Sequence, residues 1–230
     1  MGKRLTRDGW LLFVTRFVRL FSYGMLGVVL VLYLTRLGLS EPQTGLLLTL
    51  TLLGDAAVSL VLTTRADRIG RRRMLVIGAI LMTGAGLVFA FTRNFLLLII
   101  AGTIGVISPS GNEVGPFLPI EQAALSGVIS NRIRTSVFAW YALAGAIATA
   151  AGSLFAGIAT GLMEKAAKTP LASQRLIILL YAAFGVVLAL VFRMLPPSVE
   201  WMAKRRRPRA RSICSGLEHR EAWCFDSAGF

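Results

Sequence analysis

Residues 44–92 read TGLLLTLTLLGDAAVSLVLTTRADRIGRRRMLVIGAILMTGAGLVFAFT, two apolar runs joined by a short, strongly basic stretch. Each run is about as long as the roughly 20 apolar residues that let a helix cross the hydrocarbon core of a bilayer. Strands of a membrane barrel would instead alternate polar and apolar residues over about 10 positions. The stretch therefore predicts two membrane-spanning helices, at 44–64 and 74–92, with a tight basic turn between them.

The composition of the whole chain is that of a membrane protein. Hydrophobic residues make up 55% of the 230 residues, charged residues only 16%, and the mean hydropathy is +0.69. A soluble domain carries about 25% charged residues, so this chain lacks the polar surface of a water-soluble globule. Four further apolar runs flank the first two, at 11–35, 94–115, 135–163 and 176–195. We therefore predict an all-α integral membrane bundle of six transmembrane helices over 11–195.

The basic residues are distributed unequally between the two sides of the predicted membrane. The net charge is +14, and 20 of the 25 Lys and Arg residues lie within residues 1–19, in two alternate connections, or from Arg193 to the C-terminus. Segments rich in Lys and Arg stay in the cytoplasm. We therefore expect a multi-pass protein of the cell (plasma or inner) membrane with both termini cytoplasmic. Because this topology explains the basic surplus, we expect no nucleic-acid partner.

The basic turn at 63–73, TTRADRIGRRR, combines one acid with several arginines. Asp67 is a carboxylate at a helix end, and it can pair with Arg68 or Arg71 or lie at a neighbouring helix N-terminus. Gly70 permits a tight turn that a side chain would strain. The turn therefore has the composition of an electrostatic latch between helices.

This turn resembles the loop signature of the major facilitator superfamily, Gly-x-x-x-Asp-Arg-x-Gly-Arg-Arg or Lys, with Thr63 in place of the first Gly. Helix number and orientation extend the resemblance over roughly 11–195. The resemblance implies one six-helix half of a major facilitator fold, built as a three-plus-three inverted repeat, and secondary transport of a small solute. It also implies a conformational latch against the other half, formed by Asp67, Arg68, Gly70, Arg71 and Arg72.

Three ionisable residues lie at membrane depth in the first two runs. Asp55 is near the middle of 44–64, and a carboxylate at that depth is costly unless it faces a cavity or a cation. Asp55 is thus either a protonatable or substrate-facing group, or a packing residue paired with Arg16 or Arg19. Arg16 is a further candidate for substrate or proton coupling. We expect at least one of the two arginines to snorkel toward the cytoplasm.

Residues 108–122, SPSGNEVGPFLPIEQ, interrupt the apolar pattern with prolines, glycines and polar side chains. Proline interrupts helical hydrogen bonding, and interrupted helices often line transporter cavities. Asn112 and Glu113 are therefore candidates for solute or proton coupling, with Glu113 the stronger candidate for a buried role. We interpret Glu121 and Gln122 as a polar helix end that leads into a cytoplasmic loop.

The run 135–163 carries small residues that allow another helix to approach closely. They are Gly145, Ala148, Gly152, Ala156, Gly157 and Gly161. We expect this face to be a helix-packing surface.

Patterns for enzymatic or cofactor chemistry are absent from the sequence. There is no phosphate-binding loop of the Gly-x-x-x-x-Gly-Lys-Ser/Thr type, and a Ser-His-Asp triad is excluded because the single His lies near the C-terminus. Cys214, His219 and Cys224 offer at most three irregularly spaced metal ligands. We expect no enzymatic activity, no cofactor and no metal.

The two ends of the chain differ from the bundle. Residues 1–10 form a short cytoplasmic N-terminus, and 196–230 form a basic linker followed by an atypical tail with both Cys and the only His. We hypothesise that a reading-frame change ended a longer gene product here.

Two functions follow from such an N-terminal half. The first is solute transport, by proton-coupled efflux, through self-association or together with a separately made second six-helix half. The second is a non-transporting membrane fragment, inert or regulatory through helix association.

Overall fold

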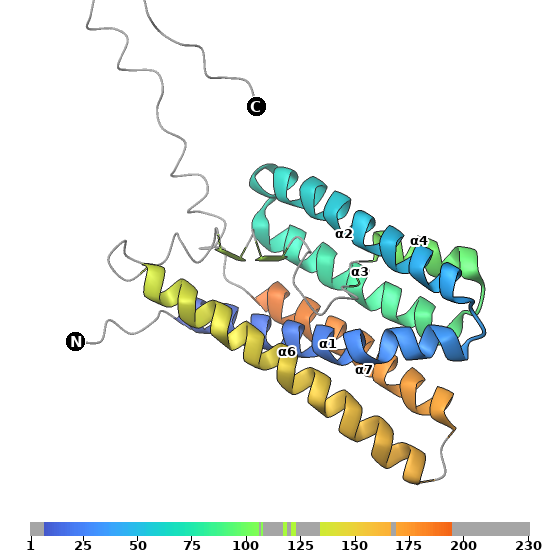
Figure 1. The fold of residues 1–230 in the computed structure, drawn as a ribbon. Helices are drawn as coiled ribbons and strands as arrows, with labels where there is room; N and C mark the ends of the chain where they lie inside the picture. The colour runs from blue at the N-terminus through green and yellow to red at the C-terminus, as the bar shows by residue number, and fades with distance from the viewer. Residues whose placement is uncertain are drawn as a thin grey trace, which may run out of the picture.

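The computed structural model describes residues 7–105, 107, 117–118, 121–122, 134–166 and 169–194. The helices are α1 (Arg7–Arg36), α2 (Glu41–Ile69), α3 (Arg71–Phe91), α4 (Phe95–Ile104), α6 (Arg134–Lys165) and α7 (Pro170–Met194) (Figure 1). No strand occurs in these ranges, so the predicted all-α class is confirmed.

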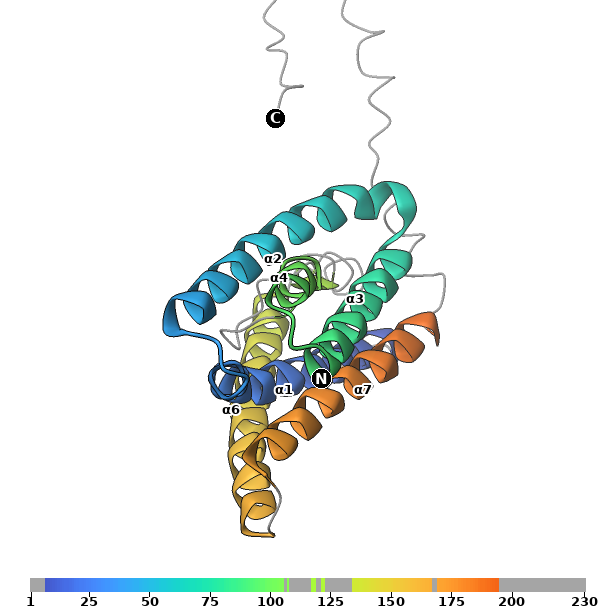
Figure 2. The ribbon, with the colours of Figure 1, turned by 90° about the vertical axis from the view of Figure 1, so that its right-hand side faces the viewer.

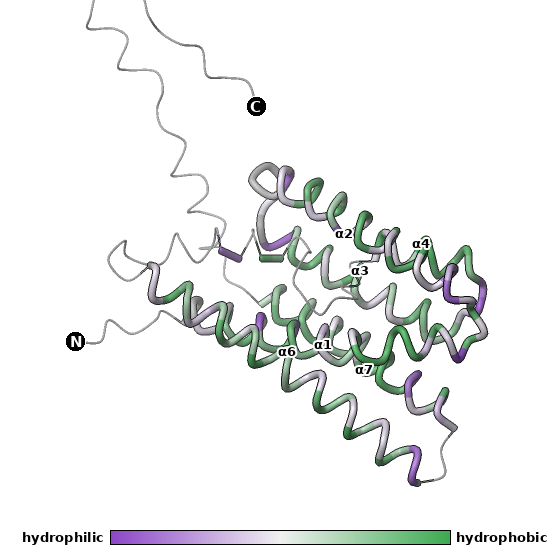
Figure 3. The backbone as a smooth tube through the Cα atoms, in the orientation of Figure 1, coloured by the Kyte–Doolittle hydropathy of each residue, from purple (hydrophilic) through white to green (hydrophobic). Residues whose placement is uncertain are grey.

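Five helices, α1, α2, α3, α6 and α7, are long and apolar enough to cross a membrane. Each begins before its predicted apolar run, and all but α7 begin at a charged residue, because helical hydrogen bonding continues where the side chains are solvated. Figure 3 shows hydrophilic residues at the helix ends and hydrophobic ones along their lengths. The described part of α4 has 10 residues, and the rest of the predicted span 94–115 lies largely outside the described residues. The chain is a multi-pass membrane protein.

The helices pack in pairs around a central α1. α1 contacts α6 and α7, α3 contacts α7, and α2 contacts α4. Seen from the side in Figure 2, α4 lies between α2 and α3. In its most apolar stretch α1 is 61% buried, against 28% for α2 and 22% for α6, which lie on opposite sides of the bundle (Figures 1 and 2).

Only part of the small-residue face of α6 packs against α1. A Cβ at Gly152 would lie 2.0 Å from the carbonyl oxygen of Phe21, and one at Gly145 would lie 2.5 Å from the Leu20 side chain. For Gly157 and Gly161 no described atom lies within 4 Å of that position. The packing expectation is therefore wrong for the latter pair, because these two glycines lie on the exposed side of α6, whereas Ala156, directly before Gly157, is fully buried.

The turn between α2 and α3 is a single residue, Gly70, with φ 112° and ψ 130°. This is a region that residues with a Cβ enter only at a cost of order 1–3 kcal/mol. We expect Gly70→Ala to lower the stability of the bundle by roughly this amount, measured as a lower thermal unfolding midpoint in detergent. Gly45→Ala is the control, since a Cβ there would meet no described atom within 4 Å. Equal midpoints for the two variants would contradict the strain argument.

Candidate functional site

A cluster of buried polar side chains lies where α1 and α6 meet the segment between α4 and α6. We call it the Arg19–Glu121 cluster; its members are Arg16, Arg19, Glu121 and Tyr141. Arg19 and Glu121 have no exposed surface, and Arg16 and Tyr141 are buried as well. Four polar groups so enclosed require mutual hydrogen bonds to offset their loss of water.

Arg19 and Glu121 form a bidentate ion pair at the centre of this cluster. Arg19 Nη1 donates to Glu121 Oε1 at 2.6 Å, and Nη2 donates to Oε2 at 2.8 Å. The Tyr141 hydroxyl donates to the same Oε2. Paired, parallel hydrogen bonds of this kind fix geometry as well as charge. Glu121 thus joins α6 to α1, although it lies 102 residues away from Arg19 in the sequence.

Each of the two guanidinium groups of the cluster lies over the face of an aromatic ring. The Arg16 guanidinium lies 4.2 Å from the centre of the Tyr141 ring, and that of Arg19 lies 4.5 Å from the Phe117 ring. Phe117 in turn stacks on Phe192 of α7, with ring centres 6.0 Å apart. Cations are attracted to ring faces, more strongly when desolvated. The cluster therefore links α1, α6 and α7 at one end of the bundle.

Two interpretations from the sequence are wrong at this place. Glu121 is buried in the bundle rather than part of a loop, although its neighbour Gln122 is exposed. Neither Arg16 nor Arg19 snorkels, since 7% and 0% of their surfaces are exposed. The physical reason is the same in both cases, because buried partners hold the arginines inside the bundle.

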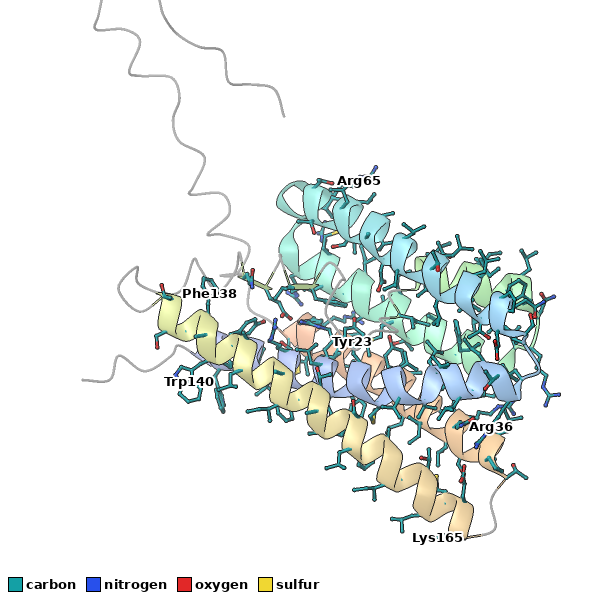
Figure 4. The ribbon with its side chains drawn as sticks, in the orientation of Figure 1. Tyr23, Arg36, Arg65, Phe138, Trp140 and Lys165 are labelled. Atoms are coloured by element: carbon teal, nitrogen blue, oxygen red, sulfur yellow. The ribbon has the colours of Figure 1, made fainter. Side chains whose placement is uncertain are left out.

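Asp55 occupies a second buried position, in α2. It has no exposed surface, and neither carboxylate oxygen has a hydrogen-bond partner in the described part of the chain. Two buried tyrosines from other helices, Tyr23 of α1 and Tyr181 of α7, also lie in the interior, with their ring centres 6.3 Å apart. Figure 4 shows Tyr23 in the interior of the bundle. The alternative pairing of Asp55 with Arg16 or Arg19 is therefore wrong.

The residues of the expected latch lie at the ends of α2 and α3. The backbone of Asp67, Arg68 and Arg71 is helical, and their side chains lie outside what the structure describes. Arg72 Nη2 donates to the backbone carbonyl of Arg193, in the last turn of α7. A cation there complements the negative end of the helix dipole. Arg72 thus joins α3 to α7 within this bundle.

Asn112 and Glu113 lie outside the described residues, as do Cys214, His219 and Cys224. In the ranges that the structure does describe, no group of three His, Cys, Asp or Glu residues could hold a metal ion.

Comparison with known proteins identifies the family. The sequence profile of the Major Facilitator Superfamily matches residues 12–223. An uncharacterized membrane protein of Saccharomyces cerevisiae is 40% identical over 200 residues, which cover 86% of this chain and 45% of that protein. Quinolone resistance protein NorA of Staphylococcus aureus is 30% identical over 104 residues, 45% of this chain and 27% of NorA. The chain spans less than half the length of either relative. With its apolar helices and the profile match over most of its length, this chain belongs to the major facilitator superfamily.

Proposed function

We propose that this chain is the N-terminal half of a secondary active transporter that moves a small solute across the cell membrane, and that it is not an enzyme. The observation that carries the proposal is Asp55, a fully buried carboxylate without a partner among the described residues of a membrane-spanning helix. Such a residue is expensive, and membrane proteins use it mainly to exchange a proton or to face a solute path. Both termini lie in the cytoplasm in this proposal.

The pairing of the helices supports a three-plus-three inverted repeat. If α1, α2 and α3 correspond to α4, α6 and α7, the α1–α6 contact maps onto the α4–α2 contact, and α3–α7 maps onto itself. Residues 51–54 of α2 and 149–152 of α6 both read Thr-x-x-Gly. A Cβ on either of these glycines would lie 2.0 Å from a backbone oxygen of the partner helix, that of Thr103 or of Phe21.

Transport by this fold would require a second set of helices to complete the wall of the solute pathway. In transporters of this kind one half rocks against the other around a site near the bilayer midplane. We propose that a second six-helix half, or a second copy of this chain, supplies that wall. The latch residues Asp67, Arg68, Gly70, Arg71 and Arg72 would steady one of the two conformations. Asp55 would carry the coupled proton during efflux, and Asn112, Glu113 and Arg16 would face the same path.

The proposal is tested by proton-driven accumulation of a quinolone, chosen because the name of the NorA relative includes resistance to this class. In inverted vesicles containing the 230-residue chain, we expect an imposed pH gradient to drive uptake. Asp55→Asn removes the ionisable group and is expected to lower uptake at least roughly tenfold, within the range of losses known for proton-transfer residues. Asp55→Glu, which keeps a carboxylate, is expected to retain part of the activity.

Glu164→Gln is the matched control for this experiment. It also removes a carboxylate, but from a 39% exposed pair with Arg36, so uptake is expected to be unchanged. Absence of quinolone uptake by the wild-type chain, with normal membrane insertion, would count against efflux of this class. It would favour the alternative, a non-transporting fragment acting through helix association, which the largely uncovered surfaces of α2 and α6 support.

A further inference from the structure

A groove of about 230 Å³ lies at the beginning of α7, at the end of the bundle opposite to the α2–α3 turn. The residues that line it are Thr169, Leu171, Ala172, Arg175, Leu176 and Leu179. The wall is therefore mainly aliphatic, with a single cation in the second turn of a 25-residue membrane-spanning helix.

The cation of this groove presents an unsatisfied donor. Arg175 is only partly exposed, and its Nε atom is buried without a hydrogen-bond partner in the described ranges. The nearest ion pair in sequence is Arg36–Glu164, and no ion pair of Arg175 is found in those ranges. Leaving a buried donor of a charged group unpaired costs free energy. The groove is thus suited to an anion.

The sequence that leads into this groove is rich in cations, although this end of the bundle is otherwise poor in them. The sequence places Lys165, Lys168 and Arg175 within eleven residues of one connection. Figure 4 shows Arg36 and Lys165 at the end away from Arg65. Since the nearby carboxylate of Glu164 already binds Arg36 at 3.2 Å, it does not balance the local positive charge. The positive N-terminal end of α7 adds to that charge.

We propose that this groove binds a membrane phospholipid through its headgroup phosphate. A guanidinium fork matches phosphate oxygens in geometry and charge, and a helix N-terminus favours the same anion. Leu171, Leu176 and Leu179 give the groove an apolar wall that fits an acyl chain. A free phosphate would make no contact with such a wall that stabilises its binding. This lipid site goes beyond the proposed transport and does not depend on it.

Native mass spectrometry of the purified 230-residue chain in detergent tests the proposal. Three probes separate the contributions: dioleoylphosphatidylglycerol, dioleoylglycerol with the same chains and no phosphate, and glycerol 3-phosphate with no chains. We expect wild-type protein to retain phosphatidylglycerol only. Arg175→Gln is expected to weaken that binding by about tenfold, which corresponds to one lost charge-assisted contact. Arg175→Lys keeps the charge without the fork and is expected to show an intermediate loss.

Arg93→Gln is the control, because it removes an exposed cation from the same end of the bundle and lies outside the groove. We expect it to bind phosphatidylglycerol like the wild type. Equal losses in Arg93→Gln and Arg175→Gln would overturn the site in favour of general electrostatics. Displacement of phosphatidylglycerol by equimolar glycerol 3-phosphate, or equal retention of dioleoylglycerol, would overturn it as well. Wild-type gel-filtration behaviour of Arg175→Lys guards against an effect of misfolding.

Discussion

Glu121→Ala is expected to lower the free energy of unfolding by roughly 3–5 kcal/mol. The change leaves the fully buried Arg19 guanidinium without the carboxylate that binds it at 2.6 and 2.8 Å. It also removes the acceptor of the buried Tyr141 hydroxyl. Breaking one side of a buried ion pair is costly because the other charge stays in a medium that solvates it poorly. Unfolding of the detergent-solubilised chain by increasing mole fraction of SDS, followed by circular dichroism, measures the loss.

Two comparisons separate this effect from the simple removal of a carboxylate. Glu164→Ala breaks the exposed pair with Arg36 and is expected to cost at most about 1 kcal/mol. The double variant Arg19→Met/Glu121→Met replaces both charges by apolar groups and is expected to recover most of the stability, as in other buried pairs. Similar unfolding curves for the Glu121→Ala and Glu164→Ala proteins would show that the buried pair is not the source of stability.

The number and approximate place of the long helices follow from the sequence because the bilayer imposes a length. Runs such as 44–64 and 135–163 must form their backbone hydrogen bonds internally in hydrocarbon, and this requirement is local. The helix class could therefore be predicted without knowledge of any tertiary contact. The single-residue turn at Gly70 is equally local, since its backbone conformation depends on the absence of a Cβ.

The partner of Arg19 could not be predicted in the same way, because it lies 102 residues away. Locally, Glu121 follows two prolines and precedes a polar residue, which is the pattern of a helix end. A usable signal was the scarcity of acids: Asp55, Glu113 and Glu121 are the few carboxylates available between the basic connections to neutralise two arginines at membrane depth. Which of these carboxylates pairs with an arginine depends on how the helices pack, and no local sequence pattern predicts that packing.

The orientation of α6 about its own axis likewise decides which of its small residues pack. Gly145 and Gly152 lie against α1, whereas Gly157 and Gly161 have the same chemistry and a recognised small-x-x-x-small spacing but meet no described atom. The sequence predicts a face that permits close approach. Which side of α6 turns toward α1 depends on the remaining helices, above all α7, which contacts both.

Gly152→Leu is the second variant for which we expect a large effect, a loss of about 3 kcal/mol or more in the free energy of unfolding. A Cβ at this position would lie 2.0 Å from the Phe21 carbonyl oxygen and 2.8 Å from its carbon. These are backbone atoms, so no side-chain rotation can make room and α1 must move away from α6. The SDS unfolding assay used for Glu121→Ala gives the value.

Gly157→Leu places the same side chain on the same helix where no described atom lies within 4 Å. We expect a change within about 0.5 kcal/mol, because a leucine there faces lipid and favours the helix more than glycine does. Equal losses at the two positions would refute close packing of α1 on α6.

The corresponding pair on α2, Gly54→Leu against Gly45→Leu, extends the test, since a Cβ at Gly54 would lie 2.0 Å from the Thr103 oxygen. If the two contacts are related by an internal repeat, we expect Gly54→Leu and Gly152→Leu to lower the free energy of unfolding by similar amounts.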